Sequence, residues 1–347
     1  MSPRPPPEAL LPWALSVLGA SGGCSSLPPL DAVAGDASSR RYFRFRCAGE
    51  SYVVVEAPPA TEKNEAFLAV RTLLADAGVT VPALLGVDLG RGFLLLEDLG
   101  DRLLLPALGS SSADRYYSRA FEVLGSIAAV APDCTGLSEY DRALLTEELS
   151  RFEEWFVRGL LEYSPGEAEQ TLLTGVFERL LSSALEQPTV LVHRDFHSRN
   201  LMLLDDDSLA VIDFQDAVVG PITYDLVSLL RDCYIQWPAD QVDAWALTYR
   251  DQLLALDKLP DMDDALFLRW FDWMGLQRHI KVLGTFARLY LRDGKSAYLD
   301  DLPLVIHYVQ EIAHKYATEE PLFAEFSSWF SCRLAPLIAQ QDWSKHT

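Results

Sequence analysis

Residues 193–200 read HRDFHSRN and directly follow a short apolar run typical of a buried strand. The octet has the form HxDxxxxN, and a second apolar run further along the chain leads into Asp213. Phosphoryl transfer needs a group that orients the attacking hydroxyl and accepts its proton, together with oxygen ligands for Mg²⁺. Asp195 has the position of that base, and Asn200 and Asp213 are oxygen donors of the kind that Mg²⁺ prefers. The pattern predicts phosphoryl transfer with Asp195 catalytic and with Asn200 and Asp213 as metal ligands.

Each residue of this pattern also has a plainer interpretation. Asp and Asn are common in turns beside buried strands, so Asp195, Asn200 or Asp213 taken singly indicates a turn. Taken together, the base, the amide and the second carboxylate match a kinase catalytic loop followed by a metal-binding loop. We expect His193 to pack and support the loop, and the role of His197 stays open.

Length and charge limit the classes of protein to which the chain can belong. It has 347 residues, 49% of them hydrophobic, which is enough apolar surface for a large folded core. Lys and Arg total 29 against 50 Asp and Glu, giving a formal net charge of −21. Such an acidic chain is poorly suited to neutralising nucleic-acid phosphates, so we expect no nucleic-acid partner.

Cysteine usage and the N-terminal segment indicate where the protein works. The five cysteines are widely separated and form no CxxC pair, so neither a disulfide framework nor a zinc site is expected. The apolar stretch at residues 9–20 is interrupted by Pro12 and is too short for a membrane span. We expect an amphipathic helix there, no membrane partner and a cytoplasmic location.

The character of the sequence changes near residue 97. Residues 31–96 contain short β-like runs and turns around one helix, whereas the later sequence is dominated by long helical patterns. We expect a small β-rich N-lobe at residues 1–97 that binds nucleotide. A larger helical C-lobe at residues 98–347 is expected to carry the catalytic loop, the metal loop and the sugar-binding helices.

The whole chain resembles the aminoglycoside phosphotransferase and choline kinase superfamily. The likeness rests on the octet, on Asp213, and on residues 224–232, YDLVSLLRD, which look like the helix that follows the metal loop in that superfamily. It implies an α+β, bilobal, protein-kinase-like fold that uses ATP and Mg²⁺. It also implies that Asp225 buttresses the catalytic loop; the alternative is an acidic residue favoured by a helix N-terminus.

A narrower resemblance concerns the substrate. Residues 40–44, 55–59, 224–234 and 270–284 look like the corresponding segments of the anomeric kinases for N-acetylmuramate and N-acetylglucosamine in cell-wall sugar recycling. This resemblance implies phosphorylation of the C1 hydroxyl to give a sugar 1-phosphate during peptidoglycan recycling. The expected partners are then a small amino sugar and a nucleotide, with no protein partner implied.

The N-lobe departs from kinases at the residue that usually holds the α- and β-phosphates. Residues 52–57, YVVVEA, contain no Lys or Arg where the third strand normally supplies one. The turn at residues 35–39 could offer backbone N–H groups to phosphate. The adenine is expected at the backbone of Leu96, Glu97 and Asp98. The cations on the preceding hairpin are candidates for the phosphates, although each could equally be solvated: Arg40, Arg41, Arg44 and Arg46.

A helix predicted over residues 264–291 offers a clue to the acceptor. Met274, Arg278, Lys281, Thr285 and Arg288 recur at helical spacing, so three cations share one face. N-Acetylmuramate carries a lactyl carboxylate that a cation of this face could bind. The cations could instead be paired with neighbouring acids or exposed to water. The candidate sugar contacts are Arg231, Asp232, Gln277, Arg278, His279 and Lys281.

Two other functions remain open at this point. An aminoglycoside or choline-type kinase would use the same catalytic and metal residues, but its cationic acceptor would favour an acidic pocket over a basic helix face. A catalytically silent pseudokinase or binding module would explain the vacant lysine position, although the base and both metal ligands are present.

Overall fold

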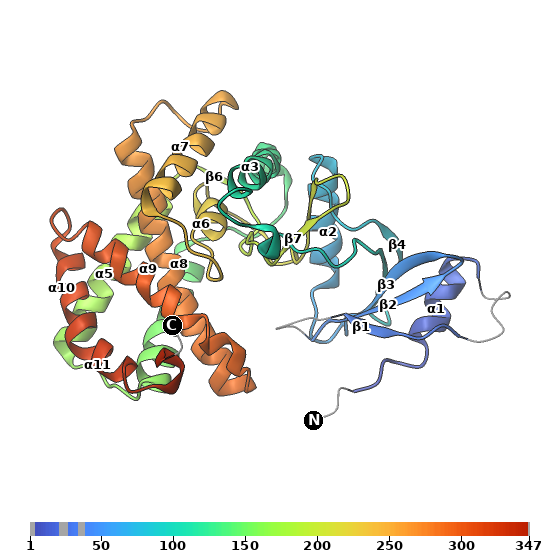
Figure 1. Ribbon diagram of the computed structural model, residues 1–347, viewed down its shortest axis with the longest axis horizontal. Helices are drawn as coiled ribbons and strands as arrows, with labels where there is room; N and C mark the ends of the chain where they lie inside the picture. The colour runs from blue at the N-terminus through green and yellow to red at the C-terminus, as the bar shows by residue number, and fades with distance from the viewer. Residues whose placement is uncertain (1–3, 21–26, 34–38, 346–347) are drawn as a thin grey trace. The chain divides into compact units, whose positions relative to one another are not determined.

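The computed structural model describes residues 4–20, 27–33 and 39–345, which fold as two compact units (Figure 1). The first unit contains the chain up to residue 106 together with residues 199–216. The second contains residues 107–198 and the chain from residue 217 onward. Most of the turn proposed for phosphate binding lies outside the described residues, and the lobe boundary at residue 97 stays a prediction.

A five-stranded antiparallel sheet forms the centre of the first unit. The strand order is β1-β2-β3-β5-β4, so the hairpin of β2 and β3 lies in the middle. Helix α1 covers one face, where Phe43, Phe45 and Val54 pack into a core with Leu10 and Leu15. The elements of this part are α1 (Leu10–Val17), β1 (Asp31–Val33), β2 (Arg41–Cys47), β3 (Glu50–Glu56), α2 (Asn64–Asp76), β4 (Leu84–Asp88) and β5 (Phe93–Glu97).

Strand β2 alternates as its sequence predicts. Phe43 and Phe45 are buried, whereas Tyr42 and Arg44 are partly exposed and Arg46 is exposed. Because successive side chains of a strand point to opposite faces, Arg44 and Arg46 share the face that α1 does not cover. This alternation explains why a strand rich in arginine forms part of a buried sheet.

A short hairpin, β7 (Leu201–Leu203) and β8 (Leu209–Val211), belongs to the first unit although it comes late in the chain. The backbone after β5 holds it: Leu104 N–H donates to the Leu201 carbonyl at 2.8 Å, and Leu203 N–H donates to the Arg102 carbonyl at 2.7 Å. The two loops with kinase-like residues are therefore tied to different units, since the catalytic loop before residue 199 stays in the second.

The second unit is mainly helical and is organised around α8 (Asp264–Asp293). Asp263 caps the start of α8 by accepting from Leu266 N–H at 2.7 Å, and Gly294, at φ +70°, ends it. At Gly284 a Cβ would lie 2.3 Å from the carbonyl carbon of Arg151, so only glycine permits this close approach to the neighbouring π-helical segment Phe152–Leu160. Of the helices described, none is both long and apolar enough to cross a lipid bilayer.

The remaining elements of the second unit surround α8. A two-stranded antiparallel sheet of β6 (Thr189–Val192) and β9 (Val218–Pro221) brackets the catalytic loop. Helices α4, α5, α6, α7 and α9 all pack on α8. The helices are α3 (Ala113–Ala129), α4 (Arg142–Arg151), α5 (Glu167–Leu185), α6 (Tyr224–Leu230), α7 (Ala239–Ala255), α9 (Leu302–Lys315), α10 (Pro321–Trp329) and α11 (Ala335–Ile338).

Candidate phosphoryl-transfer site

The loop that carries Asp195 is fixed by a carboxylate at the start of α6. Asp225 accepts hydrogen bonds from the backbone N–H groups of His193 at 2.7 Å and Arg194 at 3.0 Å. The Asp195 N–H donates to His193 Nδ1 at 3.2 Å, and the buried His193 ring packs against Phe196. The predicted supporting roles of Asp225 and His193 are confirmed.

Arg194, the residue before the candidate base, has a backbone conformation that side chains rarely adopt. Its φ is +77°, in the left-handed region that favours glycine. Its N–H is held by Asp225, and its guanidinium pairs with Glu148 and lies over the Tyr140 ring at 5.5 Å. Contacts from separate elements therefore hold this turn in an unfavourable conformation.

Asp195 is partly buried among cationic groups of the second unit. Burial raises the pKa of the Asp195 carboxyl, but Lys281, His197, Arg194 and His193 oppose this effect, so the pKa lies below its usual value. Asp195 is therefore ionised at neutral pH. An ionised carboxylate on a fixed loop can orient a substrate hydroxyl and accept its proton as phosphoryl transfer proceeds.

A fully buried acid on α4, Glu148, lies behind this loop. Its carboxylate accepts from the Tyr140 hydroxyl and pairs with Arg194, and Lys281 Nζ lies 3.0 Å from its Oε1. Lys281 also donates to the Tyr224 hydroxyl at 2.8 Å. Burial raises the pKa of Glu148, but Lys281 and Arg194 outweigh it, and the pKa is lowered. For Lys281, the alternative of pairing with a neighbouring acid is the one observed.

Arg231 and Asp232, the two charged residues that follow α6, are both buried, and each binds a residue of another element. Asp232 accepts from the N–H of Ser198 at 2.9 Å and from its hydroxyl, which attaches the end of the catalytic loop to α6. The other oxygen of Asp232 has no hydrogen-bond partner among the described residues. Arg231 Nη2 lies 2.6 Å from Asp272 Oδ1 on α8, so its guanidinium already holds a carboxylate.

The α8 residues predicted to bind sugar lie in different environments. Arg278 is 4% exposed and donates to Cys233 Sγ at 3.6 Å, and within the described chain no carboxylate pairs with it. His279 is fully buried: its Nε2 lies 2.9 Å from the Arg231 carbonyl, and its ring stacks on Tyr308. Gln277 is fully buried, and in the described structure neither of its amide atoms has a hydrogen-bond partner. Their contact with a sugar stays a prediction.

The two candidate metal ligands are brought to the same end of the β7–β8 hairpin. The Ile212 N–H donates to the Asn200 carbonyl at 3.1 Å, which places Asn200 opposite the residue before Asp213. Asp213 has φ +63° and accepts from Gln215 Nε2 at 2.8 Å. Magnesium is commonly bound by one or two carboxylates completed by substrate phosphates, and an amide oxygen beside one carboxylate fits that donor set.

Arg40 is a buried cation of the first unit. It is 3% exposed, its guanidinium lies over the Phe67 ring at 4.8 Å, and Nη2 donates to Asn64 Oδ1 at 3.3 Å. Glu62 Oε2 lies 3.7 Å from its Nε. Arg40 and Asp213 also both act electrostatically on Tyr42, which indicates that this cation lies near the metal loop.

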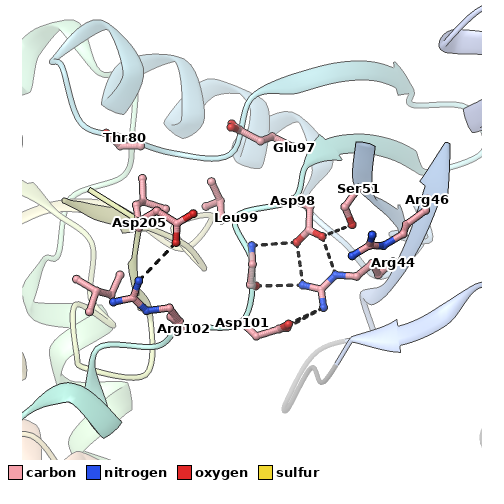
Figure 2. A pocket seen from close by; sticks show the side chains of 13 residues that line it. Arg44, Arg46, Ser51, Thr80, Glu97, Asp98, Leu99, Asp101, Arg102 and Asp205 are labelled. Atoms are coloured by element: carbon pink, nitrogen blue, oxygen red, sulfur yellow. Dashed lines mark hydrogen bonds and ion pairs between the residues drawn. The ribbon is translucent and has the colours of Figure 1, made fainter. Parts of the chain in front are cut away.

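Of the other predicted phosphate cations, Arg41 and Arg44 are bound to carboxylates, whereas Arg46 is exposed. Arg41 pairs with Glu56 on β3. Arg44 Nε donates to Asp98 at 2.7 Å, and its Nη1 donates to Asp101 at 2.8 Å, so the guanidinium bridges two acids just after β5 (Figure 2). A pocket of about 500 Å³ in the first unit is lined by residues that include Arg44, Asp98, Asp101, Arg46, Glu97 and Arg102. Leu96, which precedes Glu97 on β5, is buried. Binding of adenine at this segment stays a prediction.

Comparison with known proteins decides the family. A family model described as a phosphotransferase enzyme family matches residues 30–267. The chain belongs to the phosphotransferase enzyme family. An N-acetylmuramate/N-acetylglucosamine kinase from Pseudomonas putida is 42% identical, over 82% of this chain and 83% of its own. A kinase of the same name from Pseudomonas aeruginosa is 41% identical, over 83% of this chain and 85% of its own.

A solved choline kinase from Streptococcus pneumoniae extends the likeness to the fold. It superposes with a TM-score of 0.58 at 15% identity, covering 88% of this chain and 99% of that one. The predicted α+β fold of this phosphotransferase family is therefore confirmed, as is the prediction that the chain is a phosphotransferase.

Sequence reasoning missed the acid that organises the loop of this phosphotransferase. Glu148 stands in a stretch of α4 that also contains Glu147, and no motif distinguishes the two. The structure separates them, because Glu147 is exposed and pairs with Arg151 whereas Glu148 is buried. The available signal was the helical period of 3.6 residues, which places Glu148 on the same buried face as Leu145 and Phe152.

Proposed function

We propose that this phosphotransferase is an ATP- and Mg²⁺-dependent sugar kinase. It transfers the γ-phosphoryl group to the anomeric C1 hydroxyl of N-acetylmuramate, N-acetylglucosamine or both, giving the sugar 1-phosphate in peptidoglycan recycling in the cytoplasm. The observation that carries the proposal is the ionised Asp195 on a loop clamped by Asp225. The names of the relatives at 41–42% identity support the choice of sugar.

In the proposed reaction, Asp195 hydrogen-bonds to the C1 hydroxyl and takes its proton. A bond forms between the sugar oxygen and the γ-phosphorus as the bond to the β-phosphate oxygen breaks, and ADP leaves. Asn200 and Asp213 would hold Mg²⁺, which would offset the charge on the phosphate oxygens. The action of Asp195 and of these two ligands on one nucleotide stays a prediction.

Among the four hairpin arginines, Arg40 is the best candidate to replace the missing third-strand lysine. In protein kinases the third-strand lysine pairs with a glutamate of the following helix. Arg40 lies 3.7 Å from Glu62, two residues before α2, whereas Arg41 and Arg44 are already bound by carboxylates. We therefore assign the nucleotide phosphates to Arg40 and the nucleobase to the backbone of residues 96–98, with Arg41 and Arg44 bordering the nucleotide site.

For the acceptor, we assign the lactyl carboxylate of N-acetylmuramate to Arg278. Arg231 and Lys281 each hold an internal carboxylate, whereas Arg278 has only the Cys233 sulfur as its hydrogen-bond acceptor in the described structure. Asp232 presents a buried oxygen without a hydrogen bond, which suits a sugar hydroxyl. Gln277 and His279 remain candidates for the acetamido group.

The identity of the reaction product tests the proposed function. Purified protein is incubated with ATP, Mg²⁺ and each amino sugar, and proton NMR is recorded; a phosphorus-coupled H1 signal is expected, and it also reports the anomer. Transfer to another hydroxyl would contradict the C1 assignment. Transfer to kanamycin or choline in place of the amino sugars would favour the other kinase types. Absence of transfer to any acceptor, with ATP still bound, would favour a binding module.

A further inference from the structure

The cluster around Glu148 contains more positive than negative charge. One carboxylate, Glu148, pairs with two cations, Arg194 and Lys281. All three are largely buried, and burying an ion is unfavourable unless its charge is balanced. Asp195 lies next to Arg194 in the chain, and its carboxylate supplies the charge that balances the second cation.

Lys281 is held from two sides by residues on different elements. Its ammonium contacts Glu148 on α4 and the Tyr224 hydroxyl on α6, while its own backbone lies in α8. Tyr224 is fully buried, and its ring packs against Tyr140, whose hydroxyl also reaches Glu148. The ammonium therefore has a fixed position. Burial raises the pKa of Asp195, and Lys281 is the foremost of the cations that lower it.

Arg194 links the same acid to the backbone of the catalytic loop. Its left-handed conformation requires support from its surroundings, which Glu148 provides through the guanidinium and Asp225 through the N–H. Glu148 thus fixes both a residue adjacent to Asp195 and a cation that acts on Asp195.

We propose that Lys281 is a positioning residue for Asp195, and that Glu148 holds Lys281 and Arg194 in place for this task. The inference rests on the proposed function, because it takes Asp195 to be the group that receives the proton. In this arrangement Lys281 does not bind the sugar; its ammonium, held by Glu148 and the Tyr224 hydroxyl, places a fixed positive charge behind the catalytic loop.

The test separates a positioning residue from a sugar ligand. Lys281→Met removes the charge at similar length, and kcat and KM are measured for both amino sugars and for ATP. We expect kcat to fall about 30-fold with either sugar while each KM changes less than about twofold. Lys281→Arg, which keeps the charge, is expected to recover most of that loss. A KM increase confined to N-acetylmuramate, or an unchanged kcat, would overturn the proposal.

Two further variants distinguish a specific loss of activity from a loss of folded protein. Tyr224→Phe removes only the hydroxyl that holds Lys281, and kcat is expected to fall about threefold with KM unchanged. Should Lys281→Met fail to fold, an unchanged kcat in folded Tyr224→Phe would by itself refute the inference. Arg179→Met is the matched control, since Arg179 pairs with the buried Glu320 at 2.6 Å between α5 and α10. It should lower Tm without changing kcat.

The two proposals fail in distinguishable ways. If the wild-type protein phosphorylates kanamycin or choline but neither amino sugar, the proposed substrate is wrong. The ratio of kcat between wild type and Lys281→Met, measured with the acceptor that works, still tests the role of Lys281.

Discussion

The Asp225 carboxylate and the backbone N–H of His193 form a buried hydrogen bond of 2.7 Å, which joins the start of α6 to the turn before Asp195. The second Asp225 oxygen accepts from the N–H of Arg194. In Asp225→Asn, an amide NH₂ would face one of these donors, so the turn should lose its position. We expect kcat to fall by about tenfold or more, with little change in KM. Asp240→Asn, on an exposed position of α7, is the control and should match wild type.

Asp195→Asn tests the base directly. Asparagine keeps the shape of the side chain but cannot accept the hydroxyl proton, so kcat should fall by about 10²–10⁴-fold. The circular dichroism spectrum should stay near that of wild type, because the loop is held through Asp225 and Glu148. Tm should fall, because the neutral asparagine no longer offsets the charge of the nearby cations. A folded Asp195→Asn protein with near-normal kcat would remove the basis for the catalytic assignment.

Asp213→Ala addresses the metal ligands. Removing one of the two oxygen donors at the end of the β7–β8 hairpin should abolish turnover at ordinary Mg²⁺ concentration. Steady-state rates measured over a Mg²⁺ titration should show half-saturation raised by about tenfold or more. The control is Asp76→Ala, at the exposed end of α2 in the same unit. Equal Mg²⁺ dependence in both variants would argue against Asp213 as a ligand.

The sequence indicates the two candidate loops directly, because the residues of each loop follow one another along the chain. HxDxxxxN and the following Asp are local patterns, and the alternation in β2 is a local consequence of strand geometry. Pairings between distant elements were not predictable in this way. In the sequence, the basic residues of α8 recur at one helical spacing and look equivalent. In the structure, Lys281 contacts Glu148 of α4, whereas Arg278 contacts Cys233. Such differences depend on which helix packs against each position, and residue spacing does not encode that.

Arg278→Met tests selection of the acidic sugar. Only N-acetylmuramate carries the lactyl carboxylate, so loss of the guanidinium should raise its KM by about 10- to 100-fold while the KM for N-acetylglucosamine changes little. Arg288→Met, in the same predicted stripe, is the matched control, since the charged residues that act on Arg288 are Arg151, Arg292, Glu147 and Asp293, and Asp195 is not among them. Equal increases for the two sugars in Arg278→Met would disprove recognition of the carboxylate by this residue.

His279 makes the stability of the fold depend on pH. Burial, with Arg278 nearby, lowers the pKa of its ring from the ordinary 6.5 of a histidine to about 3. Between these two pKa values the unfolded chain binds a proton that the native protein does not. The contribution of His279 to the free energy of unfolding is therefore complete above pH 6.5 and declines as the pH falls. From pH 7 to pH 5 the free energy of unfolding should drop by about 2 kcal/mol on this account alone. Urea denaturation of wild type and His279→Gln at both pH values measures this contribution.

Glutamine can still donate to the Arg231 carbonyl but does not titrate, so the variant should lose less stability on acidification, by about 2 kcal/mol. Asp225, whose pKa burial raises to about 6, also titrates in this range, but it does so in both proteins and cancels in the comparison. Identical pH dependence of wild type and variant would mean that His279 takes up a proton in the folded state. The ring would then have to turn from the Arg231 carbonyl toward a carboxylate, and the packing on Tyr308 would differ from that seen between α8 and α9.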